Sequence, residues 1–550
     1  MTGTNPGFDI DEWIRGWRGP LLAALIAVLA GLPSLALLPP LDRDESRFAQ
    51  ATTQMLHTGD LVDIRFQDQP RHKKPVGIHW MQAAAVSLTT GPEAGAIWAY
   101  RLPSLLGAAL AAFAAAWGAA ALIGRREGFA AGVILGVTFL LSSEAGIAKT
   151  DAVLCGLVTL AMAALARMYV DQAGGRDPAR RHKLIFWAAV AVAVLVKGPV
   201  GPLVPALALL ALGLWDRRWG WMRHIGWGWG ALLLIAIVGP WAVAVTVATD
   251  GAFWGTAIGG DLAPKLVGGH ERHWGPPGQH LLLLPLLFFP AGLLLPAALT
   301  GAWRDRTEPV VRFALCWLIP TWIMFEAAPT KLWHYTLPAF GALAWLAARA
   351  LFRPISKRLL IAGLIIGGFG ALLVSAIAVY GLSEIGGEGA EAPAAMMIVF
   401  AVAALVLPAL FLMRQMPWQA LATAAVAGII AHAGLAATAR SLAPLWVSPR
   451  LAEAVAALPS APTGPLAIAG YSEPSAVFLL GTATAFTDGA GAAQALAERR
   501  PVAVERAFEP AFRAEARRLG LSPRPAARIE GVNYSKGDPV DLTLYTPQPQ

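Results

Sequence analysis

Acidic and basic residues are concentrated in residues 41–81, directly after the first apolar run of membrane length. The whole chain is 56% hydrophobic and 14% charged, so these residues need an explanation beyond solubility. Asp44 and Glu45, close to Arg47, are carboxylates that could take a proton from a hydroxyl group at the lipid boundary, or orient that group. A structural alternative stays open, because Asp42 and Glu45 have the spacing of a capping box at the start of a helix.

The same stretch contains Lys73 and Lys74 immediately before Pro75. Proline suits the first position of a helix, so both lysines are expected at a helix N-terminus on the membrane surface. Ammonium groups beside unpaired backbone N–H groups can hold an anion. Attraction of the two lysines to anionic lipid headgroups is the simpler alternative.

Three further lysines, Lys149, Lys197 and Lys331, stand alone at the ends of apolar runs. One such lysine could simply extend its ammonium group to the membrane surface. Several at one depth favour a shared anionic ligand. Asp151 and Glu144 are expected at the same depth and could instead be ion-pair partners of these lysines.

Histidines suggest two more candidate contacts. His270 and His273 flank an acidic and a basic residue in a polar loop, a combination that invites a metal ion. Their spacing is a weak signal, so a phosphate or substrate contact and plain loop packing remain alternatives. His334 and Tyr335 follow Lys331 by three and four positions. All three would share one face if this segment is helical.

About thirteen apolar runs are long enough to cross a bilayer, which predicts a multi-pass membrane protein. They cover residues 20–38, 97–122, 129–147, 152–170, 184–196, 200–214, 226–248, 281–300, 311–327, 337–351, 359–380, 395–413 and 419–437. An odd number places the two termini on opposite sides. Arginines and lysines gather in alternate connections, which the positive-inside rule assigns to the cytoplasm. The N-terminus is therefore expected in the cytoplasm, and residues 41–81 on the other side.

The predicted fold class is an all-α polytopic membrane protein with a small C-terminal soluble α/β domain. Residues 1–440 form the membrane domain, whose first outer loop is 39–96, and residues 441–550 form an extracytoplasmic domain. In this tail, 466–471, 476–481, 501–506 and 540–545 read as strands, and they alternate with amphipathic helical stretches.

Several classes of function lack support in the sequence. No glycine-rich loop precedes a Lys-Ser or Lys-Thr pair, and neither GxSxG nor HExxH occurs. The basic residues are scattered, which disfavours nucleic acid as a partner. Cys155 and Cys316 lie inside apolar runs and predict neither a disulfide nor a thiolate metal site. The candidate site is expected on the outer side of the membrane, next to the bilayer. The simplest phosphate-bearing ligand there is a lipid-linked one.

An ordered series of motifs resembles the membrane glycosyltransferases of the GT-C fold. It is similar to the aminoarabinose transferases that act on lipid A and to the dolichyl-phosphate-mannose protein mannosyltransferases. The resemblance covers roughly residues 20–350, in the segments DESRFA (44–49), KKP (73–75), KTD (149–151), KGP (197–199), HERHWGPP (270–277) and PTKLWHYTLP (329–338).

This resemblance implies a polyprenyl-phosphate sugar as donor, with Asp44 as the key acid of the first loop. It implies that Arg47, Lys74, Lys197 and Tyr335 contact the donor phosphate. Two departures from the family pattern occur: Phe48 stands where tyrosine is common, and Lys73 where glutamate is common. The second removes a carboxylate that helps to hold a metal in some relatives. No metal and no other cofactor is therefore predicted.

The resulting hypothesis is an inverting glycosyltransferase of the bacterial inner membrane, which transfers a sugar to a lipid A-like or protein acceptor on the periplasmic side. The first rival is a transporter or flippase of a lipid-linked anion. Transporters usually place ionisable groups near the middle of the membrane, whereas these lie at span ends. The second rival is an assembly protein whose tail docks partners.

Overall fold

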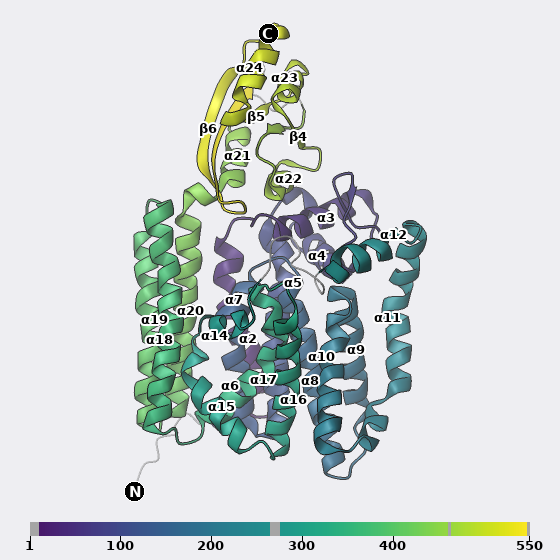
Figure 1. The fold of residues 1–550 in the computed structure, drawn as a ribbon, viewed down its shortest axis with the longest axis vertical. Coiled ribbons are helices and arrows are strands. Elements are labelled where there is room, and N and C mark those ends of the chain that lie inside the picture. Colours follow the sequence, from purple (N-terminus) through teal and green to yellow (C-terminus); the bar gives the residue numbers. More distant parts are fainter. Residues whose placement is uncertain (1–9, 265–274, 460–463, 547–550) are drawn as a thin grey trace.

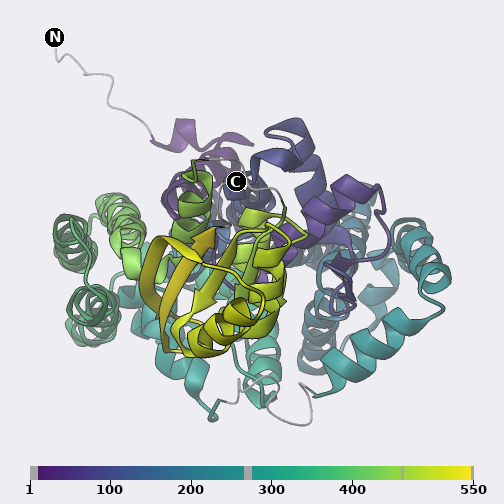
Figure 2. The same ribbon diagram turned by 90° about the horizontal axis from the view of Figure 1, so that it is seen from above.

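The computed structural model describes residues 10–264, 275–459 and 464–546. A bundle of helices carries a small domain at one end (Figure 1). The last helix of the bundle ends at Ser441, and the chain then enters the small domain. Seen from above, that domain lies over the bundle, while α18, α19 and α20 stand as a group at one side (Figure 2).

The bundle accounts for most of the chain. Its helices are α1 (Ile10–Trp13), α2 (Arg18–Leu37), α5 (Ile97–Leu122), α6 (Arg125–Gly136), α7 (Phe139–Ala145), α8 (Asp151–Ala173), α9 (Arg180–Lys197), α10 (Val200–Asp216), η2 (Gly220–Ile225), α11 (Trp227–Ala248), α12 (Ala252–Trp254), η3 (Gly255–Leu262), α14 (Gln279–Leu287), η4 (Ala291–Leu294), α15 (Leu295–Arg304), α16 (Pro309–Ala327), η5 (Trp333–Ala339), α17 (Phe340–Leu351), α18 (Lys357–Tyr380), η6 (Gly381–Ile385), α19 (Glu391–Met413) and α20 (Pro417–Ser441).

All thirteen predicted apolar runs are helical in the structure. Within the described residues, eight helices are long and apolar enough to cross a membrane, and ten spans result if each bent pair counts as one. The bent pairs are α6 with α7, at 62°, and α14 with η4 and α15, at 115°. The other three runs form α9, α10 and α17, so the expectation of about thirteen full spans exceeds the number that meets this criterion.

Small residues allow the central helices to approach closely. A Cβ atom on Gly107 of α5 would lie 2.6 Å from the backbone of Val153, and one on Gly156 of α8 would lie 2.5 Å from the carbonyl oxygen of Gly107. Such contacts are typical of helices that associate in lipid, where hydrophobicity alone does not drive them together. They fix α8, whose first residue is Asp151, against α5.

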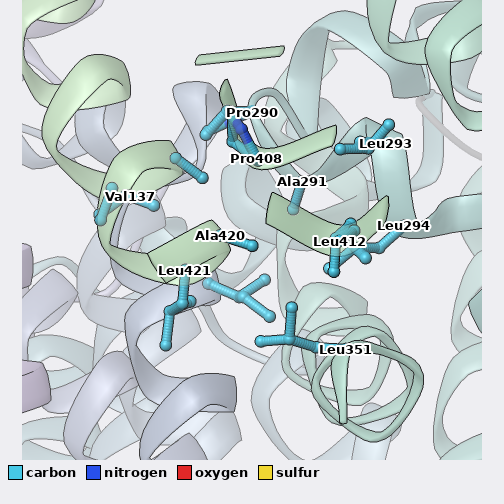
Figure 3. A pocket seen from close by; sticks show the side chains of 13 residues that line it. Val137, Pro290, Ala291, Leu293, Leu294, Leu351, Pro408, Leu412, Ala420 and Leu421 are labelled. Atoms are coloured by element: carbon cyan, nitrogen blue, oxygen red, sulfur yellow. The ribbon is translucent and has the colours of Figure 1, made fainter. Parts of the chain in front are cut away.

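A cavity of about 30 Å³ lies among α6, η4, α17, α19 and α20 (Figure 3). Its lining is apolar, with Val137, Leu294, Leu351 and Leu412 among the side chains. Nothing in this lining can bind a proton or an anion. The cavity is therefore a gap in helix packing.

The first loop forms a layer at the end of the bundle beneath the C-terminal domain (Figure 1). It contains α3 (Asp44–Thr58), the two-stranded β1 (Arg65–Phe66) and β2 (Gln69–Pro70), α4 (Gly77–Leu88) and η1 (Pro92–Ala94). The apolar face of α3 is buried, with Phe48, Ala51 and Met55 each at most 4% exposed. This amphipathic burial holds α3 against the bundle, and Asp44, its first residue, stays exposed.

The C-terminal domain combines helices with a five-stranded sheet of order β4-β3-β5-β7-β6. β3 pairs in parallel with β4 and β5, while β7 runs antiparallel to β5 and β6. The strands are β3 (Ala467–Ala469), β4 (Ala485–Thr487), β5 (Val502–Glu505), β6 (Arg524–Asn533) and β7 (Asp538–Thr546). The helices are η7 (Ala443–Leu445), α21 (Val447–Ala456), α22 (Pro474–Leu480), α23 (Gly489–Ala497), η8 (Arg506–Phe508) and α24 (Glu509–Arg518).

Three local predictions are wrong. Pro75 does not take the first position of a helix, because α4 begins at Gly77 and its capping position is Val76. Residues 476–481 do not form a strand but belong to α22, which begins with Pro474 at its first position and packs against α3 and α21. Asp42 does not cap α3, because the helix starts at Asp44 and its capping position is Arg43, whose side chain makes no capping hydrogen bond. The carboxylate of Asp42 instead accepts a hydrogen bond from Ser475 in the C-terminal domain.

Candidate active site

Asp44 is the first residue of α3, and its side chain is 66% exposed. The Arg71 guanidinium lies 3.6 Å from its carboxylate and 5.0 Å from the centre of the Phe48 ring. Burial lowers the pKa of Arg71, while the charge of Asp44 opposes that shift. Arg47 follows one turn along α3, and its charge also acts on Arg71. An accessible carboxylate therefore stands beside two cations.

Glu45 has a different environment from its neighbour. Its carboxylate accepts two hydrogen bonds from Arg101, at 2.8 and 2.7 Å, and two more from the backbone N–H groups of Leu41 and Ala148. The Glu45 side chain is 1% exposed and that of Arg101 is 0% exposed. With all its partners supplied by the protein, Glu45 is placed to hold the first loop on α5, and the geometry favours Asp44 over it as the reacting acid.

Two of the isolated lysines, Lys149 and Lys197, meet at the start of α8. Lys149 Nζ lies 3.2 Å from Glu144 and 3.7 Å from Asp151, and Lys197 Nζ contacts the other oxygen of Asp151. Although burial opposes it, the charges of Glu144 and Asp151 raise the pKa of Lys149 above its usual range. The charge of Asp44 also acts on Lys149. The structure thus confirms that Glu144 and Asp151 are ion-pair partners of these two lysines, while the shared anionic ligand stays a prediction.

Lys74 and Tyr335 complete this cluster. Lys74 Nζ lies 3.2 Å from Asp261 of η3, and its charge acts on Lys197. Lys197 Nζ in turn lies 5.4 Å from the centre of the Tyr335 ring, a cation–π distance. The structure therefore brings Lys74, Lys149, Lys197 and Tyr335 together from four separate segments.

Lys331 does not join them. Its ammonium group donates to the carbonyl oxygens of Gly275 and Ala328, at 3.1 and 2.8 Å, and the residue is 6% exposed. These bonds hold the segment that leads into η5. His270 and His273 lie outside the described residues.

A metal ion has one candidate site in the described part of the chain. Three residues each offer one ligand atom, and these atoms lie within 4.8 Å of one another: Glu144, Asp151 and His334. However, both carboxylates already pair with Lys149 or Lys197, and His334 lies 3.3 Å from Lys149 Nζ. A divalent cation would have to displace or closely approach these ammonium groups. The donor set suits an ion-pair network better than a metal.

Sequence reasoning missed three residues that touch this site: Arg71, Arg101 and Asp261. Arg71 and Asp261 lie in loop or irregular helical segments with no periodic pattern to place them. Arg101 carried a usable signal, because a lone arginine near the start of a long apolar run must find a partner.

Comparisons with known proteins agree with this architecture. The family model of dolichyl-phosphate-mannose-protein mannosyltransferase matches residues 75–253. An undecaprenyl phosphate-alpha-4-amino-4-deoxy-L-arabinose arabinosyl transferase of Pseudomonas paraeruginosa is 30% identical over 57% of this chain and 56% of its own length. A transferase of the same description from Aeromonas salmonicida is 28% identical over 70% of each. The match thus spans little more than half the length of the Pseudomonas relative.

Solved structures extend the likeness to the whole chain. The crystal structure of ArnT from Cupriavidus metallidurans bound to undecaprenyl phosphate superposes with a TM-score of 0.74 at 20% identity, covering 98% of this chain and 100% of that one. The chain has the GT-C fold. The Archaeoglobus fulgidus oligosaccharyltransferase is a more distant GT-C match, with a TM-score of 0.51 at 12% identity over 86% of this chain and 64% of its own. The fold prediction is therefore confirmed.

Proposed function

We propose that the protein is a membrane glycosyltransferase that moves one sugar from a polyprenyl-phosphate donor to a lipid acceptor. The descriptions of the similar transferases support this donor, and one similar structure holds undecaprenyl phosphate. One observation carries the proposal from this chain itself. Asp44 is an exposed carboxylate at the membrane end where Arg47, Arg71 and a cluster of partly buried lysines converge.

The proposed reaction is an in-line displacement at the anomeric carbon, with inversion. The acceptor oxygen forms the new bond, and the bond from the anomeric carbon to the donor phosphate oxygen breaks with its electron pair leaving on the phosphate. Lys74, Lys197 and Arg47 stabilise the negative charge that develops there. Asp44 takes the proton of a hydroxyl acceptor, or orients an acceptor that is already an ionised phosphate.

Replacing Asp44 tests the central role. We expect Asp44→Asn to fold normally, since the side chain is exposed, and to lower kcat for sugar transfer by about 100-fold or more if the acceptor is a hydroxyl. The measurement is transfer of labelled sugar from a polyprenyl-phosphate donor by purified protein. Asp68→Asn is the matched control, because Asp68 is an exposed acid of the same loop. Wild-type turnover by Asp44→Asn would remove Asp44 from the mechanism.

The acceptor is identified by mass. Lipids and membrane proteins from cells with the wild-type protein are compared with those from cells with Lys74→Ala. A sugar increment missing from a glycolipid supports a lipid acceptor. An increment missing from a protein would redirect the proposal to protein glycosylation. Movement of lipid between leaflets by reconstituted protein, without any acceptor gaining mass, would favour the transporter alternative.

A further inference from the structure

A cavity of about 950 Å³ lies at the end of the bundle opposite the candidate active site. Helix α8 connects the two places: it begins at Asp151 and ends at Ala173 after 23 residues, a length of roughly 34 Å. The cavity lies where α8 and α10 end and α16 begins, with Tyr169, Asp216 and Arg312 in its lining. The proposed reaction uses none of these groups.

The lining offers hydrogen-bond donors that have no acceptor. Arg312 Nε and Trp221 Nε1 are buried, and neither has a hydrogen-bond partner in the described part of the protein. The carboxylate of Asp216 cannot serve them, because it already accepts from Arg312 Nη1 and, at 3.0 Å, from Tyr169 Oη. A buried donor without an acceptor is costly, so these two N–H groups favour an acceptor that the protein itself does not supply.

Two arginines add positive charge to the same cavity. Arg217 and Arg218 follow the end of α10, line the cavity and are both exposed. Within residues 10–264, 275–459 and 464–546, neither forms an ion pair. The single carboxylate in the lining is neutralised by Arg312. The cavity therefore presents two uncompensated cations together with unsatisfied N–H donors, a combination that favours an acceptor-rich anion.

The surroundings show that this anion would sit at the membrane boundary. Trp215 and Trp219 are 42% and 48% exposed, and the neighbouring Leu214 is 64% exposed. Tryptophan collects where lipid headgroups meet the hydrocarbon. The Trp219 ring is fixed by close packing on Gly213, where a Cβ atom would lie 2.5 Å from the ring. An occupant of this cavity could place a polar head on the arginines and an apolar tail beside Leu214.

We propose that this cavity binds the phosphodiester headgroup of an anionic phospholipid in the leaflet opposite the candidate active site. The phosphate oxygens accept from the Arg217 and Arg218 side chains. When the Arg312 and Trp221 side chains turn toward the headgroup, their Nε and Nε1 N–H groups, which are buried in the unliganded structure, donate to it as well. Basic pockets between membrane helices are suited to such headgroups. The site is separate from the donor phosphate site at the other end of α8.

The test uses purified full-length protein in a nonionic detergent, titrated with phosphatidylglycerol and followed by native mass spectrometry. We expect Arg217→Gln/Arg218→Gln to weaken phosphatidylglycerol binding by roughly tenfold. Arg223→Gln/Arg358→Gln is the matched control, since it removes the same charge from exposed positions outside the cavity lining and should bind as the wild type does. Phosphatidylcholine, which has no net charge, should bind weakly to all three proteins.

A second variant separates the contribution of the cavity lining from the effect of net charge on lipid binding. Trp221→Phe keeps an aromatic ring but removes the unsatisfied Nε1 donor together with part of the indole, so it should weaken phosphatidylglycerol binding several-fold with no change in net charge. Equal binding by the wild type and the double arginine variant would overturn the proposal and leave those arginines a role in membrane orientation only. Displacement of phosphatidylglycerol by millimolar inorganic phosphate would also overturn it, because the ligand would then be a soluble anion.

Discussion

At the scale of single residues, two adjacent acids have opposite surroundings. Asp44 is open to solvent beside Arg71, whereas every oxygen of Glu45 is engaged by Arg101 and backbone N–H groups. Chemistry needs the first arrangement, because a reacting carboxylate must reach a substrate. A buried ion pair of the second kind holds parts of the chain together, and its loss leaves an uncompensated charge.

The Glu45 assignment predicts a loss of stability. Glu45→Gln should lower the free energy of unfolding by about 3 kcal/mol, because the charge of Arg101 stays buried without its partner. Thermal unfolding of the purified protein measures this. Glu93→Gln is the control, since the Glu93 side chain is 87% exposed. Unchanged stability together with lost sugar transfer would instead place Glu45 in the reaction.

Asp42 predicts a pH dependence of stability. Burial raises the pKa of this carboxyl from 3.8 to about 6, with Glu473 adding to the shift and the hydrogen bonds from Ser475 and at Tyr534 opposing it. The folded state therefore binds the proton more tightly than the unfolded state. This favourable contribution is complete below about pH 4 and is lost as the pH rises through about 6.

Asp42→Asn should abolish the loss of stability that the wild type shows as the pH rises through about 6, because an amide does not ionise. We expect the melting temperature of the variant, relative to the wild type, to rise between pH 4 and pH 7.5. The corresponding gain in the free energy of unfolding is about 3 kcal/mol at most. It is expected to be smaller than this, because Asp42 is partly exposed and solvent screens its charge. Asp538→Asn, at an exposed position of the same domain, should show no such rise. A constant difference across this pH range would contradict the raised pKa.

At the scale of elements, the β6–β7 hairpin reaches the loop that carries Asp44. At the hairpin turn, Tyr534 Oη accepts from the Asp42 N–H at 2.6 Å, and the Ser535 carbonyl oxygen accepts from the Arg43 side chain at 2.5 Å. Arg43 has a φ of 62°, a conformation that a side-chain-bearing residue rarely adopts. Contacts on both sides of Asp42 and Arg43 thus hold the start of α3, and with it Asp44, in a defined position.

This contact predicts a catalytic effect of a distant hydroxyl group. Tyr534→Phe should lower kcat about tenfold through misplacement of Asp44, while the KM for the donor stays close to that of the wild type. Tyr545→Phe is the matched control, because it removes a hydroxyl from the same domain that bonds to Glu509 and Arg513. An equal effect of both variants on kcat would show that only the stability of the domain matters.

At the scale of the whole molecule, hydropathy and charge predict which end faces the cytoplasm. The positive-inside rule places the C-terminal domain and the candidate active site outside the cytoplasm. Labelling with a membrane-impermeant maleimide in intact spheroplasts tests this. Ala507→Cys should react, and Thr307→Cys, at the other end of the bundle, should react only after permeabilisation. Background labelling should be low, because Cys155 and Cys316 are 0% and 2% exposed. The reverse pattern would invert the proposed orientation.

The helices of the membrane domain agree with the predictions from the sequence for a physical reason. Apolar runs mark helices dependably, because a segment in lipid must satisfy its own backbone hydrogen bonds. All thirteen runs are helical for this reason. In the C-terminal domain, short apolar runs do not distinguish a strand from a helix: residues 476–481 have the pattern of a strand, but they belong to α22, which packs against α3 and α21.

The sequence by itself determined the helical membrane fold and the residue types of the candidate site, since both depend on local composition and on short motifs such as DESRFA and KTD. Only the tertiary structure decided which charges meet. Glu45 pairs with Arg101, 56 positions away, and Lys74 with Asp261, 187 positions away. Ion pairs over such separations depend on how the helices pack in three dimensions, and no periodicity along the chain records that packing.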